Sequence, residues 1–197
     1  MKIMTKGQRT KTVILSAAKT LINSRGFKAT SISDIIAASG VKKGTLYFHF
    51  SGKEDLGKAI LEQSRQESAD FLEASLKGSS VAEKLANYLD AVLQKHKQAR
   101  FVGGCLIGNT ALEMADSNPA FLETIQLTFA HWRNTLTELL AEGKKNGELS
   151  STLPPEQLAV LVVAVIEGGI MMSRTGKKED ELRTCLESLR HILGISS

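Results

Sequence analysis

A run of cationic, hydroxyl-bearing and aromatic side chains between positions 42 and 49 carries the clearest chemistry in this 197-residue chain. Lys42 and Lys43 are suited to neutralise phosphates. Gly44 lets a nucleic-acid backbone approach without a Cβ in the way. Thr45 offers a hydroxyl and a methyl to base edges. This mixture at consecutive positions favours a helix that lies against double-stranded DNA.

The aromatic residues of the run extend that interpretation. Tyr47 can reach a phosphate or a thymine methyl, and His49 can donate to a phosphate, although both also fit as ordinary surface or boundary residues. Phe48 leaves two possibilities open, contact with a thymine methyl or inward packing. Leu46 and Phe50 are spaced by four, so they are expected to face inward and hold the helix.

Two short helices around Ser39-Gly40-Val41 are predicted to position the run. Helices over 32–39 and 43–49, joined by a tight turn with glycine, have helix-turn-helix spacing, and the second would lie in the major groove. Thr30 and Ser31 open the first helix, where free amides and hydroxyls can also bind a phosphate. Lys53 lies beside another set of free amides, within the Ser51-x-x-Glu54 capping box that opens the fourth helix.

The distribution of charge agrees with a polyanionic partner. Residues 1–60 hold 11 Lys and Arg and 3 acidic residues, a net charge of +8, whereas residues 61–197 hold 14 and 18, a net charge of −4. A basic N-terminal block on a mildly acidic body suggests that one end meets nucleic acid. Within the block, Lys2, Lys6, Arg9 and Lys11 are expected to form a mobile arm near phosphates, or to serve solubility alone.

Helical periodicity and helix-stop residues organise nearly the whole chain, and no strand is convincing. The first helix carries Val13–Ile22 and ends at Arg25, and further helices are predicted at about 32–39, 43–49, 52–76, 81–98, 105–115, 119–145, 156–174 and 179–193. The longest apolar run, Leu158 to Ile166, is too short to span a bilayer, and no signal peptide is evident. Cys105 and Cys185 form no CxxC motif, so a cytoplasmic protein is expected.

The segment from Ala29 to Phe50, with its Gly44-Thr45-Leu46-Tyr47-Phe48-His49-Phe50 core and the following Lys53-Glu54-Asp55-Leu56, resembles the N-terminal signature of the TetR/AcrR family of transcriptional regulators. The match covers about fifty residues, and Phe48 stands where many members carry a second Tyr or a Trp. The stretch from Gly104 to Glu113 is similar to a segment seen in one subgroup of these regulators.

The resemblance implies an all-α fold of nine helices in two domains: a helix-turn-helix head at 1–52 and a ligand-binding and dimerisation body at 53–197. It also implies a homodimer through the last two helices, about 156–174 and 179–193, in which Gly168 and Gly169 allow close approach. The partners would be a near-palindromic DNA operator and an unknown small molecule. The expected function is a ligand-responsive regulator, most simply a repressor released by an inducer.

Residues that can face such a ligand are harder to assign from sequence. Glu113 and Glu167 interrupt apolar stretches and can pair with an amine on a ligand, or can face water. The remaining candidates are Cys105, Asn109, Met114, Phe121, Phe129, Trp132 and Met171. Aromatic and methionine residues at helical spacing more often form plain core. Neither a metal site nor a cofactor site is expected, because the histidines are scattered and no ligand cluster exists.

Four competing interpretations remain to be weighed. Cys105 at a helix start can be a reactive thiol that senses oxidants or electrophiles, although a small buried hydrophobe is the simpler account. Gly52 to Lys58 matches the G-x-x-x-x-G-K pattern of phosphate loops, but position 59 is Ala where Ser or Thr is needed. An all-helical enzyme or carrier would need a catalytic constellation, and none is found. A non-switching architectural DNA protein would lack an apolar pocket.

Overall fold

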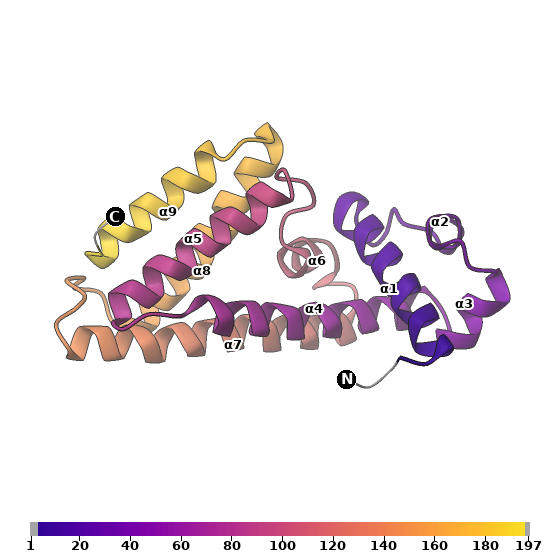
Figure 1. The fold of residues 1–197 in the computed structure, drawn as a ribbon, viewed down its shortest axis with the longest axis horizontal. Helices are drawn as coiled ribbons and strands as arrows, with labels where there is room; N and C mark the ends of the chain where they lie inside the picture. The colour runs from indigo at the N-terminus through magenta and orange to yellow at the C-terminus, as the bar shows by residue number, and fades with distance from the viewer. Residues whose placement is uncertain (1–3, 196–197) are drawn as a thin grey trace. The chain divides into compact units, whose positions relative to one another are not determined.

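The protein is described by a computed structural model that covers residues 4–195, and these residues form nine α-helices and no strand (Figure 1). The helices are α1 (Lys6–Arg25), α2 (Ile32–Ser39), α3 (Lys43–His49), α4 (Lys53–Ser75), α5 (Val81–Gln98), α6 (Leu106–Met114), α7 (Pro119–Lys145), α8 (Pro155–Gly176) and α9 (Asp180–Leu193). The all-α class and the order of elements are confirmed, because caps and breaks mark the helix ends in the sequence itself.

The chain divides into two compact units. The first contains the residues up to Arg65 together with Leu106–Ile125, and the second contains Gln66–Cys105 together with the residues from Gln126 onward. Helices α4 and α7 therefore contribute to both units. The units do not coincide with a division after residue 52, because α6 and the start of α7 pack with the N-terminal helices. A functional division after residue 52 stays a prediction.

The first unit is built on fully buried aliphatic side chains. Ile14, Ala18, Ile35, Leu46 and Leu56, from α1, α2, α3 and α4, have no exposed surface. Burial of each large aliphatic side chain contributes about 1.5–3 kcal/mol, so the short helices α2 and α3 are stabilised by packing rather than by their length.

Gly57 of α4 has a packing role in the same unit. A Cβ at this position would lie 2.5 Å from Phe121 Cζ and 2.6 Å from Phe27 Cε2. The rings of Phe27 and Phe121 meet edge to face, with centroids 4.9 Å apart. The segment that matches a phosphate-loop pattern, Gly52 to Lys58, is mostly part of helix α4. Its second glycine, Gly57, is explained by the close contact between this helix and two aromatic rings.

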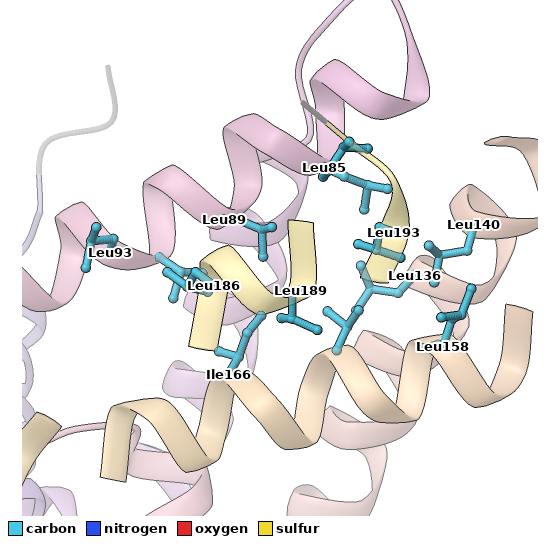
Figure 2. Close-up of a cluster of buried hydrophobic side chains, with 14 of the residues drawn as sticks. Leu85, Leu89, Leu93, Leu136, Leu140, Leu158, Ile166, Leu186, Leu189 and Leu193 are labelled. Carbon is cyan, nitrogen blue, oxygen red and sulfur yellow. The ribbon is translucent and has the colours of Figure 1, made fainter. Parts of the chain in front are cut away.

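The second unit surrounds a cluster of leucine, isoleucine and valine side chains from α5, α7, α8 and α9. Figure 2 shows the aliphatic side chains of this cluster pointing toward one another, among them Leu89, Leu136, Leu158 and Leu189. At its edge Arg190 of α9 bonds Asp90 Oδ1 at 2.8 Å and the carbonyl of Ala86 at 3.1 Å, which joins α9 to α5. The C-terminal helices thus share one core.

Helix α8 packs along α9 (Figure 1), and a glycine permits the contact. A Cβ at Gly169 would lie 3.0 Å from Leu182 Cδ1 and 3.1 Å from Cys185 Cβ, whereas a Cβ at Gly168 would meet nothing within 4 Å. The two neighbouring glycines, both expected to allow close helix approach, therefore differ. Gly169 serves packing within the chain, and Gly168 faces open space.

Helix α8 is also long and apolar enough to cross a membrane, by length and composition alone. The sequence had predicted no membrane span from its longest uninterrupted apolar run, and this feature of α8 does not overturn that prediction. A core helix of a soluble protein passes the same test. Leu158, Ala159 and Val162 of α8 are buried within the second unit, which accounts for part of its apolar character.

Candidate nucleic-acid interface

The first helix of the predicted DNA-reading pair begins at a complete capping box. Asp34 N donates to Ser31 Oγ at 3.1 Å, and the Asp34 carboxylate accepts from the Ser31 amide at 2.8 Å and from the Ser31 hydroxyl at 2.6 Å. These bonds, led by the one from the hydroxyl, lower the pKa of Asp34. Helix α2 ends at Gly40, which has φ +69° and donates its amide to Ile36 O, so the chain turns sharply into α3.

Helix α3 separates inward and outward side chains as the sequence predicts for a recognition helix. Leu46 is fully buried and Phe50 is 2% exposed, which fixes the helix on the first unit. Tyr47 is 45% exposed and Phe48 is 83% exposed. The choice left open for Phe48 is thereby decided at the level of packing, since its ring lies outside the core and is available to a partner.

The start of α3 is open to a ligand that carries negative charge. Lys42 and Lys43 are exposed, and no side chain caps the first amides of α3. A Cβ at Gly44 would meet nothing within 4 Å, so the backbone here is accessible. Amides without a side-chain cap, two exposed lysines and an unobstructed glycine together suit a DNA phosphate. Thr45 lies beside them and is partly exposed.

Two other predicted DNA contacts are placed differently from expectation. Thr30 is fully buried, and its hydroxyl donates to the carbonyl of Gly26 at 2.8 Å, so its side chain supports the turn before α2 instead of facing a phosphate. Lys53 donates to the carbonyl of Lys28 at 3.2 Å and lies 4.6 Å from the ring centroid of Phe27. Its ammonium is thus engaged with the turn before α2, with further N–H donors left for a phosphate.

The basic N-terminal arm is helical where the structure describes it. Lys6, Arg9 and Lys11 belong to α1, which Thr5 caps through a reciprocal bond with Gln8, whereas Lys2 lies outside the described residues. An open groove lined by Lys6, Arg9, Thr10, Val13 and Val41 follows this end of α1. The expectation of a mobile arm is therefore wrong for 6–11, because the capping box starts the helix at Lys6.

The start of α4 also uses a different partner from the one predicted. The backbone amide of Ser51 donates to Asp55 Oδ2 at 2.9 Å, and its hydroxyl lies 3.2 Å from the same oxygen. The sequence had suggested Glu54 as the acidic member of this cap. A carboxylate one residue later serves because it can reach back across the first turn to the same amide.

Two residues expected to face a ligand instead join α6 to the end of α1. The carboxylate of Glu113 accepts hydrogen bonds from the backbone amides of Phe27 at 2.7 Å and Lys28 at 2.6 Å. One helical turn earlier, the Asn109 side chain donates to Asn23 Oδ1 at 3.0 Å. The sequence offered no sign of this role, because the amides are 85 and 86 residues away from Glu113.

Glycine at position 26 makes the contact with Glu113 possible. Gly26 has φ +94°, which favours glycine, and a Cβ there would lie 3.0 Å from Glu113 Oε2. Its amide also closes α1 by donating to Ile22 O. Gly26 therefore serves both as the end of α1 and as the space into which the carboxylate fits.

The nine ligand-pocket candidates are divided between the two units. Asn109, Glu113, Met114 and Phe121 lie in the first unit, where Met114 and Phe121 are buried core. A cavity beside Phe121 has a volume of about 10 Å³, which is room for no more than one water. Neither unit alone contains the whole expected set.

The other five candidates, Cys105, Phe129, Trp132, Glu167 and Met171, lie in the second unit. Phe129 and Trp132 meet edge to face at 5.1 Å, and Met171 is 56% exposed. The side chains of Cys105 and Glu167 are hydrogen-bonded, and burial raises the pKa of Glu167 above its usual value while this bond opposes the rise. Among residues 4–195, no group of three or more His, Cys, Asp and Glu side chains is placed to hold a metal ion.

A capped helix pair with an exposed, basic and aromatic second helix, at the N-terminus of an otherwise helical chain, defines the class of helix-turn-helix DNA-binding regulators. Residues 14–60 match the model described as "Bacterial regulatory proteins, tetR family", and residues 81–189 match the model described as "Tetracyclin repressor-like, C-terminal domain". The second match alone spans more than half of the chain. The chain therefore belongs to the TetR family of transcriptional regulators.

Individual relatives agree with this family. The HTH-type transcriptional regulator LmrA of Bacillus subtilis is 30% identical over 86% of this chain and 88% of its own length. The HTH-type transcriptional repressor DhaR of a Mycobacterium species is 27% identical over 80% of this chain and 79% of its own length. A solved TetR transcriptional regulator from Chloroflexus aurantiacus is 31% identical, with a TM-score of 0.88 and 97% coverage of both chains.

Proposed function

We propose that this DNA-binding regulator is a repressor that a small-molecule inducer releases from a near-palindromic operator. The observation that carries the DNA-reading part is the outward placement of Tyr47 and Phe48 on α3 beside exposed lysines, with Leu46 buried beneath them. The head at 1–52 would read the operator, and the body at 53–197 would bind the inducer and a second chain. The name of DhaR, a transcriptional repressor, supports the sign of the regulation.

A pattern on α8 supports a homodimer through residues 156–174 and 179–193. Val160, Ala164, Gly168 and Met171 follow helical spacing and are exposed or open in the single chain. Ile192 of α9 is 37% exposed. An apolar helix face that includes a glycine with open space at its Cβ position suits close packing against a second copy, and regulators of this family form dimers.

A two-fold dimer would place its two copies of α3 in successive major grooves, whose centres are roughly 34–36 Å apart. Inducer binding would then favour a dimer whose heads no longer match that spacing. A tenfold loss of operator affinity needs about 1.4 kcal/mol of coupling between the two sites. Because family members are regulators rather than enzymes, no catalytic role is proposed, and the protein would act in the cytoplasm, where DNA and metabolites meet.

Selection of bound genomic fragments tests the DNA-reading part of the proposal. The full chain is incubated with sheared genomic DNA at physiological salt, and the retained fragments are sequenced. We expect a small set of fragments that share inverted half-sites one helical turn or a multiple of it apart. Retention of fragments without a common sequence would contradict sequence-specific binding and would favour an architectural DNA protein instead.

A second candidate function, a cysteine-based sensor on the same scaffold, is favoured by the hydrogen bond between Cys105 and Glu167. A carboxylate with a raised pKa can accept the thiol proton while sulfur bonds to the β-carbon of an α,β-unsaturated carbonyl. The proton then passes to the α-carbon of the adduct. Mass spectrometry after treatment with an enone tests this step, and failure to find a Cys105 adduct at the concentration that releases DNA would exclude it.

A further inference from the structure

Polar and aromatic side chains from four segments of the second unit converge around Glu167. Phe71 comes from α4, Tyr88 and Lys95 from α5, Cys105 from the segment before α6, and Glu167 from α8. Tyr88 and Lys95 are spaced by seven, so they share one face of α5. This group of five residues is called the Glu167 cluster below.

The contacts within the Glu167 cluster place a positive charge over an aromatic ring. The Lys95 ammonium lies 4.3 Å from the ring centroid of Phe71, and the rings of Phe71 and Tyr88 have centroids 6.4 Å apart. Burial has the largest effect on the pKa of Glu167 and raises it. The hydrogen bond with Cys105 and then the positive charge of Lys95 lower it. The Phe71 ring thus lies against the position that an ammonium group occupies, the Tyr88 ring lies next to Phe71, and the charge of the Glu167 carboxylate acts on the same ammonium.

The two charged members of the cluster differ in how easily they can move. Lys95 is exposed, so its long side chain can extend into water at small cost. Glu167 is half-buried in the middle of α8, and its carboxylate is hydrogen-bonded with the Cys105 side chain. The Glu167 side chain is therefore less free to move than that of Lys95. Burial is the largest cause of the raised pKa of Tyr88, and the negative charges of Glu167 and then Cys105 add to it. The Tyr88 phenol therefore stays neutral. Departure of Lys95 would leave a negative, aromatic-lined site.

We propose that the Glu167 cluster is the recognition site for the effector, and that it selects an organic ammonium ion with an apolar body. The ligand ammonium would take the place of the Lys95 ammonium beside Glu167 and over Phe71. Cation–π attraction and a half-buried ion pair would favour this charge over a neutral or anionic analogue. This inference depends on the proposed function, because only an effector-responsive regulator needs such a site.

The observations favour a cation over an anion that pairs with Lys95. An anionic ligand would have to lie beside the fixed carboxylate of Glu167, and the repulsion between them is strong in a half-buried site. The mildly acidic sequence after residue 60, with a net charge of −4, also favours the approach of cations. Neither the charge of the Glu167 carboxylate nor the net charge after residue 60 opposes the binding of an ammonium ion.

Calorimetric titration of the full chain with a graded probe set tests the proposal. The probes are hexylammonium and 2-phenylethylammonium, each with its matched alcohol and matched carboxylate. We expect saturable binding of at least one ammonium probe and about tenfold weaker binding of its alcohol. Glu167→Gln should weaken ammonium binding about tenfold, and Lys95→Met should strengthen it several-fold, because the variant lacks the internal competitor.

The Lys95→Met result separates ligand recognition from a merely structural role, since loss of a structural contact would not improve binding. Equal binding of ammonium probes to the wild type and to Glu167→Gln, or tighter binding of the carboxylates, would overturn the proposal. Genomic-fragment selection without any probe keeps the two proposals apart. If the chain selects an operator and binds no ammonium probe, the ammonium site is wrong and the proposed function stands. If the chain binds the probe and selects no operator, the proposed function is wrong and the ammonium site stands.

Discussion

The Glu113 carboxylate accepts a hydrogen bond of 2.7 Å from the backbone amide of Phe27, and its second oxygen accepts one of 2.6 Å from Lys28. A side chain of α6 thereby holds the turn that follows α1. The same turn receives Lys53 at the carbonyl of Lys28 and the Thr30 hydroxyl at the carbonyl of Gly26. The backbone from which α2 begins is therefore shaped by a residue far away in the sequence.

Glu113→Gln should destabilise the protein and weaken operator binding. One amide N–H₂ would replace an oxygen that accepts from a backbone donor, and loss of a charge-assisted bond to a partly buried amide costs about 1–3 kcal/mol. Urea unfolding and gel-shift titration measure the two effects. Asp116→Asn, an exposed change two residues after α6, serves as the control and should leave both measurements unchanged. An unchanged midpoint for Glu113→Gln would show that the two amides find water instead.

Tyr47→Ala should weaken operator binding while leaving the fold intact. The Tyr47 side chain is 45% exposed on α3, so its removal costs little packing, whereas loss of a contact to DNA costs about 1–3 kcal/mol. Gel-shift titration on a selected operator measures the affinity, and circular dichroism checks the helices. The matched variant Leu46→Ala removes a fully buried neighbour and should instead unfold the head. Full affinity in Tyr47→Ala would mean that α3 is not the DNA-reading helix.

The glycine pair of α8 offers a matched test of dimer formation. Gly168→Leu should raise the dimer dissociation constant at least about tenfold, because the new side chain would stand in the proposed interface. Gly169→Ala should instead lower the stability of each chain by about 1–3 kcal/mol, since its Cβ would lie 3.0 Å from Leu182 Cδ1. Sedimentation velocity and urea unfolding distinguish the two. If Gly168→Leu dimerised as tightly as the wild type, the face with Val160 and Met171 would not be the interface.

His96 should make the folded state sensitive to mild acid. It is 8% exposed, and burial followed by the charge of Lys95 lowers its pKa to about 4 from 6.5. The unfolded chain therefore binds more protons between these values. The contribution of neutral His96 is complete above pH 6.5 and is lost as the pH falls toward 4, by up to about 3 kcal/mol.

Thermal unfolding of the wild type and of His96→Gln between pH 7 and pH 4 measures this effect. The difference between the two curves should grow as the pH falls and should favour the variant. Glu167 acts in the opposite direction, because its raised pKa makes the folded state take up a proton more readily than the unfolded chain. Its contribution cancels in the comparison. Parallel curves would show that His96 charges within the folded protein at little cost.

Local signals in the sequence predicted the helices because their causes are local. Ser31, Gly40 and Pro119 begin or end helices through contacts with residues a few positions away, and the structure places the helix ends there. The alternation of buried Leu46 and exposed Tyr47 follows from helical geometry alone. Where two acidic residues follow one another, as at Glu54 and Asp55, the sequence pattern predicted Glu54 as the capping partner, and the structure uses Asp55 instead.

The sequence alone determined the fold class, the family and the residues that form the outer surface of α3, since all three depend on neighbouring residues and their periodicity. Only the tertiary structure decided what the long-range partners do. Glu113 was expected to meet a ligand and instead holds the turn at Phe27. Glu167 is hydrogen-bonded with Cys105 and interacts with the charge of Lys95 and with Tyr88. The sequence around a carboxylate in an apolar helix does not identify its partner, because packing between helices far apart in the chain brings that partner to it.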